Sequence, residues 1–440
     1  MSVASLLSRT ASFAPTEEGW VTPLSLYAFV ITGIIGGLAL DLSHLVAART
    51  QLQAAADIAA HAALYNRDIQ NDPLTAKDRA IVLARDSMPS ERYGDYLNAE
   101  DIEFGWFDGD TRTFTPDPNA RQAARVRAFR ISERTNTVAS SLLRLAGITD
   151  FDVVASSIFE TYRPFCFREG LVGEGWVDLQ SNTSYTNGFC VHSNQYVSVN
   201  SNNYYEPGTV VSMPDTGDIV LPNSGFDSNE GLYDALHAGR YNIRILNQLD
   251  DIVAGMTDSR SEHYRADYVT RPEPVTVNWR TNLGVEDFTP GRVNVITCNG
   301  KKVNLAGDVY DSMVIIGYGC DFKINNGGAF SNATLITTHT GVKSIDAPNG
   351  LRLGVDDDCA DGGEAQFITY GGIGVASGLE LYGSQMIAAG PISFQALANG
   401  IEGASIISGE TIDGTSNSSF GFCGTGMNNN FEAEYFRLRA

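Results

Sequence analysis

The hydrophobic pattern begins with one long apolar run. Residues 21–40 carry no charge, and Asp41 ends the run. Twenty apolar residues are enough to cross a bilayer as a helix. The pattern therefore predicts a transmembrane helix at 21–40, preceded by a cytoplasmic leader at 1–20. A cleaved signal peptide would have a basic region, a shorter apolar stretch and a small-residue cleavage site, so we favour an uncleaved anchor.

Helical spacing continues past the apolar run without a turn residue. One predicted helix face is formed at alternating steps of four and three by Leu38, Leu42, Leu45, Arg49, Leu52, Ala56, Ala59 and Ala63. This spacing is typical of a single amphipathic helix. We expect a helix of about forty residues, with one half in lipid and the other in water.

Shorter elements follow in the next hundred residues. The pattern predicts helices at 74–88 and 135–148, a hairpin at 101–114, and strands at 124–131 and 151–162. The second of these helices is expected to end at Gly147, since glycine favours the position after a helix. Together with the long helix, these elements predict a pilin-like α+β domain at 41–165.

From residue 166 the helical spacing fades and short β runs separated by Gly and Asn take over. Ile296, Ile315 and Ile336 lie about twenty residues apart, a period that suits stacked repeats. We expect residues 166–440 to form an all-β domain, a right-handed parallel β-helix, with a helical insertion near 231–256. A β-sandwich or jelly roll is the alternative.

The segment around residues 19–66 resembles a known family. An apolar helix is followed by Asp41, Arg49, the Gln51–Gln53 step and the run Ala55–Ala60, which contains Asp57. This combination resembles the N-terminal segment of the TadE/TadG-like proteins of Tad (tight adherence) pilus assembly. Prepilin-type processing requires Glu five residues after a Gly, whereas the fifth residue after Gly19 is Leu24. The resemblance therefore points to the larger, permanently anchored TadG-like members.

The resemblance implies a role for the long helix. Pilin-like subunits pack on one another through such helices. We expect the helix face that includes Leu52, and above all the small side chains of Ala56 and Ala59, to pack closely on other pilin-like subunits.

All six cysteines lie in the β-rich part, at Cys166, Cys190, Cys298, Cys320, Cys359 and Cys423. An even number in one region is typical of disulfides in an oxidising compartment. Proximity in the sequence suggests pairs 166–190, 298–320 and 359–423, although six cysteines allow 15 arrangements. The expected location is the inner membrane, with a single pass and the C-terminal domain in the periplasm or at the cell surface.

The formal net charge of −22 disfavours nucleic acid as a partner. The acidic stretch with Asp356, Asp357 and Asp358 is the main candidate for chemistry, as a weak calcium or acid–base site. An acidic surface loop is the simpler interpretation. The six histidines show no metal-ligand spacing and no nucleotide-binding loop is present, so no cofactor or metal is expected.

These observations predict a non-enzymatic, membrane-anchored, pilin-like structural protein of Tad/Flp pilus assembly that contributes to pilus biogenesis and surface adhesion. Its expected partners are other pilin-like and Tad secretion-system membrane proteins, the membrane, and a surface glycan. The alternative is an anchored β-helix enzyme or lectin-like module that acts on extracellular polysaccharide.

Overall fold

The computed structural model describes residues 21–70 and 72–439, so the leader expected at 1–20 lies outside the described residues. The chain forms two compact units. Unit 1 comprises the residues up to Tyr162 and those from Tyr435 onward, and unit 2 is Arg163–Glu434. Unit 2 is thus an insertion within the sequence of unit 1, and the last residues of the chain belong to unit 1 rather than to the β-rich part.

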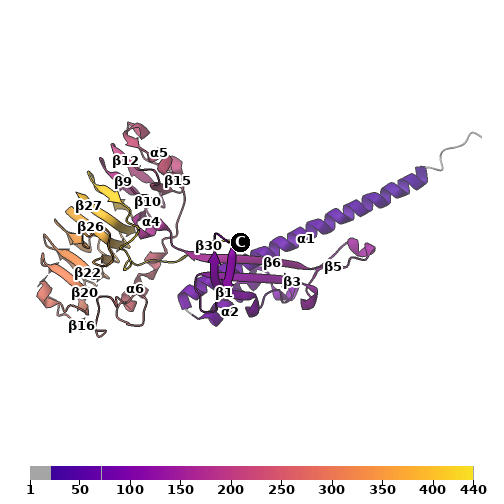
Figure 1. Ribbon diagram of the computed structural model, residues 1–440, viewed down its shortest axis with the longest axis horizontal. Helices are drawn as coiled ribbons and strands as arrows, with labels where there is room; N and C mark the ends of the chain where they lie inside the picture. Colours follow the sequence, from indigo (N-terminus) through magenta and orange to yellow (C-terminus); the bar gives the residue numbers. More distant parts are fainter. Residues whose placement is uncertain (1–20, 71, 440) are drawn as a thin grey trace, which may run out of the picture. The chain divides into compact units, whose positions relative to one another are not determined.

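Unit 1 begins with one unbroken helix, α1 (Val21–Gln70), which contains both the apolar run and the alanine-rich stretch (Figure 1). Alanine has the highest helix propensity, so nothing in the sequence stops the helix between the two halves. Helix α2 (Pro73–Ser87) follows and agrees with the helix expected at 74–88. The Asp72 side chain caps its start by accepting a hydrogen bond from the Thr75 amide.

Helix α2 packs on α1, and α1 packs on an antiparallel sheet. Its strands, in spatial order, are β2 (Thr113–Pro116), β1 (Ile102–Asp108), β3 (Ala123–Arg130), β6 (Val153–Tyr162) and β30 (Tyr435–Leu438). The first four agree with the hairpin and the two strands expected from the sequence. The fifth is the C-terminal segment, which returns from unit 2 and pairs with β6 so that Tyr435 lies opposite Tyr162.

The helix expected at 135–148 is wrong. Strands β4 (Val138–Ala139) and β5 (Asp150–Phe151) pair there instead. Between them lies only a short 3₁₀ helix, η4 (Leu143–Ala146), which ends at Gly147 with φ +89°. The pairing closes a loop that is too short for several helical turns, so the apolar residues of this stretch remain in a compact hairpin loop.

Unit 2 is an all-β unit of parallel strands arranged in three ladders. The first ladder contains, in spatial order, β16 (Val275–Thr276), β18 (Val293–Thr297), β20 (Val309–Tyr318), β22 (Ala329–Thr337), β25 (Ala365–Thr369), β26 (Ile373–Ala388), β27 (Ile392–Ser408), β7 (Gly170–Gly173), β10 (Cys190–Ser193), β13 (Val210–Met213) and β15 (Leu236–Ala238). Most neighbours in this ladder come from stretches about twenty residues apart, as the period of the sequence predicts.

The other two ladders share the long strands of the first. The second contains β17 (Asn282–Leu283), β19 (Lys302–Leu305), β21 (Asp321–Ile324), β23 (Ile345–Ala347), β26, β27, β28 (Ile412–Asp413), β8 (Val177–Leu179) and β11 (Val197–Val199). The third contains β20, β22, β24 (Arg352–Leu353), β26, β27, β29 (Ser419–Gly421), β9 (Ser184–Thr186), β12 (Asn203–Tyr205) and β14 (Asn229–Glu230).

The order of the strands shows that the last repeat of the sequence lies next to the first. Strand β27, from the last repeat, pairs in parallel with β7, from the first, and places Ile406 beside Leu171. The chain therefore enters unit 2 in the middle of the stack and winds to one end at β15. A segment that contains helix α6 (Leu249–Gly255) then connects to β16 at the opposite end. From β16 the chain winds back to the middle.

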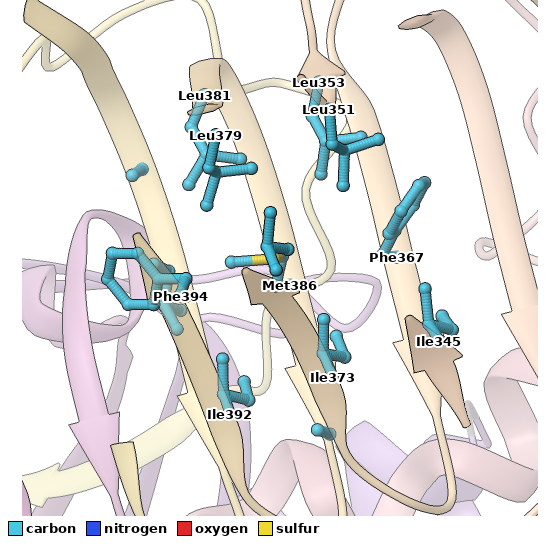
Figure 2. Packing of buried hydrophobic residues seen from close by; sticks show 14 of the residues in the cluster. Ile345, Leu351, Leu353, Phe367, Ile373, Leu379, Leu381, Met386, Ile392 and Phe394 are labelled. Atoms are coloured by element: carbon cyan, nitrogen blue, oxygen red, sulfur yellow. The ribbon is translucent and has the colours of Figure 1, made fainter. Parts of the chain in front are cut away.

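The core of unit 2 lies between the ladders and is built from rows of equivalent side chains. One row on the second ladder consists of Ile345, Ile373, Ile392, Ile412, Val177 and Val197. All six are buried, and Figure 2 shows the first three on the same side of successive strands. β-Branched side chains suit such rows because they are stiff and pack well on a pleated surface.

The helical insertion expected near 231–256 is present only in pieces. Helix α5 (Leu232–Ala235) is one turn long and runs into β15, because Leu236–Ala238 pair with β13 and extend the first ladder. A second helical stretch comprises the 3₁₀ helix Arg244–Gln248 and α6. Pairing with the preceding repeat thus overrides the helical pattern of the sequence.

Candidate functional site: helix α1 and the loop held by Asp41

Helix α1 changes its surroundings at Asp41. Of residues 21–40, only Gly37 is buried, and large apolar side chains such as Phe29 and Ile35 are exposed. Beyond Asp41 one face of the same helix enters the core of unit 1. Among the described residues, α1 is the one helix that is long and apolar enough to cross a membrane. Its uncharged stretch is the first half. An exposed apolar surface of this kind requires lipid or protein around it.

The second half of α1 packs inside its own unit. Leu52, Ala56 and Ala59 are fully buried. They share a cluster with alanines of α2, including Ala76 and Ala80, and with residues of the sheet. Small side chains let the two helices approach closely. Ala56 and Ala59 therefore hold unit 1 together and are not available to neighbouring subunits, contrary to the expectation from the sequence.

Two other residues of the family pattern lie at the edge of this core. Arg49 is exposed and Asp57 is half-buried. The Gln53 side-chain amide donates hydrogen bonds to Asp57 Oδ1, at 2.8 Å, and to the Ser156 carbonyl of β6, at 2.9 Å. The Gln–Asp pair therefore fixes α1 to the sheet.

Asp41 has the most specific environment on α1. Its side chain is 2% exposed. Oδ1 accepts a hydrogen bond from the Ser141 amide at 2.6 Å, and Oδ2 accepts from the Leu142 and Leu143 amides at 3.0 and 2.6 Å. These are amides at the start of η4, which a carboxylate satisfies well. Asp41 thus holds the loop 140–149 against α1, next to the end of the apolar run.

Gly37 makes this contact possible from the other side. A Cβ atom at this position would lie 3.0 Å from Leu142 Cβ. That separation is tighter than ordinary van der Waals contact, so a larger residue would push the loop away. The sequence marks Asp41 through the family pattern, but it gives no signal for its partner, which lies a hundred residues later in the chain.

The acidic stretch of unit 2 forms a surface loop. Asp356, Asp357 and Asp358 are all exposed, and Asp357 Oδ1 accepts a hydrogen bond from the Ala360 amide at 3.0 Å. Among the described residues, no three His, Cys, Asp or Glu side chains are placed to hold a metal ion. A polysaccharide-cleaving site would place the carboxylates of this stretch in one groove with a basic residue such as Arg352. The shallow hollow beside Asp357 is lined by Glu402 as well, but not by Arg352.

The cysteines form three disulfides, Cys166–Cys190, Cys298–Cys320 and Cys359–Cys423. These are the pairs that proximity in the sequence suggests. The first joins the entry of unit 2 to its second repeat. The third ties the acidic loop to the last repeat.

Comparisons with known proteins divide the chain in the same way. A family model described as a domain of unknown function, DUF7867, matches residues 170–424, which is more than half of the chain. The chain belongs to the DUF7867 family. A second model, described as Flp pilus-assembly TadE/G-like, matches residues 19–70. The second match confirms the resemblance of the N-terminal segment and lies on α1. No curated protein and no solved structure matches the chain.

Unit 2 contains the DUF7867 match and is called the DUF7867 unit below. It contains a buried histidine that sequence reasoning missed. His192 is fully buried, and its ring nitrogens lie 2.7 Å from Ser212 Oγ and 2.9 Å from Asn194 Oδ1. Asn194 also donates to Glu174 at 2.7 Å. Burial lowers the pKa of His192, although Asn194 and Glu174 oppose this effect. With both nitrogens engaged, His192 fixes adjacent repeats rather than offering a metal ligand.

We expect Asp41→Ala to release the loop 140–149. Without the carboxylate, the amides of residues 141–143 lose their acceptors, so their hydrogen exchange should become about tenfold faster or more. Exchange measured by mass spectrometry on a peptide spanning the loop tests this. Asp150→Asn is the matched control, because the Asp150 side chain is exposed and accepts from the Thr149 hydroxyl. Unchanged exchange in Asp41→Ala would contradict the role of Asp41.

We expect the DUF7867 unit to lose stability as the pH falls from about 7.5 to about 5.5. A histidine whose folded pKa is lowered binds its proton mainly in the unfolded state, so acid favours unfolding. Burial lowers the pKa of His263 as well. His192→Gln should therefore reduce the pH dependence without abolishing it. Urea unfolding at several pH values measures this, with the exposed His237→Gln as control. An equal pH dependence in His192→Gln and the wild type would refute it.

Proposed function

We propose that this chain is a membrane-anchored, pilin-like structural protein of Tad/Flp pilus assembly. The observation that carries the proposal is the TadE/G-like match at residues 19–70, which falls on a helix with an exposed apolar half and a half packed on a small antiparallel sheet. This is the arrangement expected of a pilin-like subunit. Residues 21–40 would span the inner membrane once.

The rest of the chain would lie in the periplasm or at the cell surface. Three disulfides support this side, since such bonds persist in oxidising compartments. We further propose that unit 2 is a right-handed parallel β-helix. The three parallel ladders and the period near twenty support a parallel β-helix, and the right hand follows the general preference of connections between parallel strands.

The face of α1 that would contact neighbouring pilin-like or Tad membrane proteins lies opposite its buried face. Ser43, Ala47, Thr50, Ala54 and Ile58 are all exposed. They follow one another at steps of four, three, four and four, so they form one side of the helix. Four of the five are small, which would allow another helix to approach closely.

For unit 2 we propose a non-enzymatic, adhesive role, with a surface glycan as ligand. The proposal rests on the contacts of the acidic residues Asp356–Asp358, the candidates for acid–base chemistry. Asp357 accepts a hydrogen bond from its own loop, and the hollow that it lines includes Glu402 but not Arg352, one basic residue that a polysaccharide-cleaving site could use. Long stacked repeats offer an extended surface of the kind that repeat proteins use for binding.

Replacing Arg163–Glu434 with an Asn-Gly turn should separate the two roles. Tyr162 and Tyr435 lie opposite each other in adjacent antiparallel strands, so a two-residue turn can join them as a hairpin. Cells that carry this turn variant in place of the wild-type protein should retain pili, counted by electron microscopy, and should attach less to surfaces. Cells that lack the whole gene should lose the pili. Loss of pili in the turn variant, or normal attachment by it, would refute the division of roles.

Ala54→Trp and Ala56→Trp form a matched pair that tests the assembly face. Ala54 is exposed, so Ala54→Trp should leave thermal unfolding unchanged and reduce the number of pili. Ala56 is fully buried, so Ala56→Trp should destabilise unit 1 by about 1–3 kcal/mol or more through overpacking. Normal piliation in the Ala54→Trp strain would show that this face is not used.

A further inference from the structure

The loop 140–149 presents a second apolar surface beside the anchor. Leu145 is 86% exposed, and Leu142 and Ile148 are 41% and 44% exposed. Single exposed leucines are common on proteins, but three large apolar side chains on one short loop are not. These side chains contribute little to the core of unit 1, so their exposure calls for another environment.

This surface is continuous with the apolar half of α1. Leu142 lies against Gly37. A groove of about 500 Å³ runs between the loop and α1, and its lining is apolar, with Val30, Gly33 and Ile34 on the helix and Leu145 on the loop. By the helical rise, Gly37 and Val30 lie about 6 Å and about 16 Å before Asp41 along the helix axis. The loop therefore reaches back along the part of α1 that is expected in lipid.

The backbone of the loop is also suited to a medium without water. Unpaired amides are costly in lipid. Those of residues 141–143 donate to Asp41. Further along, the Leu145, Gly147 and Ile148 amides donate to carbonyl groups of Leu142, Arg144 and Leu143. Internal hydrogen bonds thus satisfy most of the amides at the apolar tip.

Beyond Asp41, on the C-terminal side, the surface beside α1 is polar and basic instead of apolar. His44, which follows Asp41 by less than one helical turn, lines a pocket of about 300 Å³ with Arg92 and Arg130. Both guanidinium groups lie over the ring of Tyr93, at 5.3 and 5.6 Å from its centre. Basic and aromatic side chains of this kind are favoured at the level of lipid headgroups.

We infer that the loop 140–149 inserts into the outer leaflet of the membrane beside α1, so that Leu142, Leu145 and Ile148 contact acyl chains. Unit 1 then has two membrane contacts, a spanning helix and a shallow wedge, which Asp41 joins. The occupant of the groove is lipid. This goes beyond the proposed role in pilus assembly and rests on the proposed insertion of α1, with unit 1 on the periplasmic side.

The test uses the full chain with Leu145→Cys, labelled with an environment-sensitive fluorophore and reconstituted singly into nanodiscs of phosphatidylethanolamine and phosphatidylglycerol. The new thiol is the only one, since all six native cysteines are in disulfides. Leu145 is largely exposed, so the label should not disturb the fold. We expect blue-shifted emission and strong quenching by lipids that carry a spin label on the acyl chain.

Two control positions separate the possible outcomes. Ile35→Cys reports on the anchor and should be quenched, whereas Asp110→Cys lies in the exposed turn after β1 and should not be. Water-like emission at 145 with quenching at 35 would refute the insertion of the loop and leave the insertion of α1 intact. Water-like emission at both would overturn the anchor as well. Blue-shifted emission at 145 that lipid does not quench would assign the groove to protein and overturn the inference.

Discussion

The pairing of β27 with β7 is the constraint on which the architecture of the DUF7867 unit depends. A stack of repeats usually begins at one end and finishes at the other. Here the last repeat lies on the first, so both the entry and the exit of the chain fall in the middle of the stack. The asparagines Asn417, Asn182 and Asn202 link the repeats across this junction by side-chain hydrogen bonds. All three have positive φ, a conformation that asparagine tolerates better than most residues.

The same constraint explains why unit 2 is an insertion. A stack whose two chain ends lie together can be placed between two adjacent strands without disturbing either of them. Strands β6 and β30 provide this place, since Tyr162 and Tyr435 are paired. Unit 1 remains a complete α+β unit, in which α1 covers the sheet and Asp41 fixes the loop 140–149.

The sequence predicts the local features of this fold well. The apolar run, the TadE/TadG-like pattern, the hairpin near 101–114 and the period of the β runs are all encoded by neighbouring residues. Long-range pairings are not. Nothing local to Tyr435 shows that it returns to β6, and nothing near Ser140 shows that Asp41 binds the next three amides. The same limit applies to register. Ile315 pairs with Asn294 and Leu335. These residues lie two positions before Ile296 and one position before Ile336, the isoleucines that suggested the period. A period fixes the spacing of repeats, whereas the register depends on bulges and turns between them.

The double connection between the two units has a mechanical consequence. A tensile load on unit 2 enters unit 1 through two neighbouring strands at once, because Tyr162 and Tyr435 are paired. The component of this load along β6 acts on eight residue pairs shared with β3, which slip together in shear rather than open one after another. Each connection carries part of the tension, and neither can be drawn out alone while its neighbour is held. The insertion thus gives unit 2 a two-stranded tether, which a simple C-terminal fusion would lack.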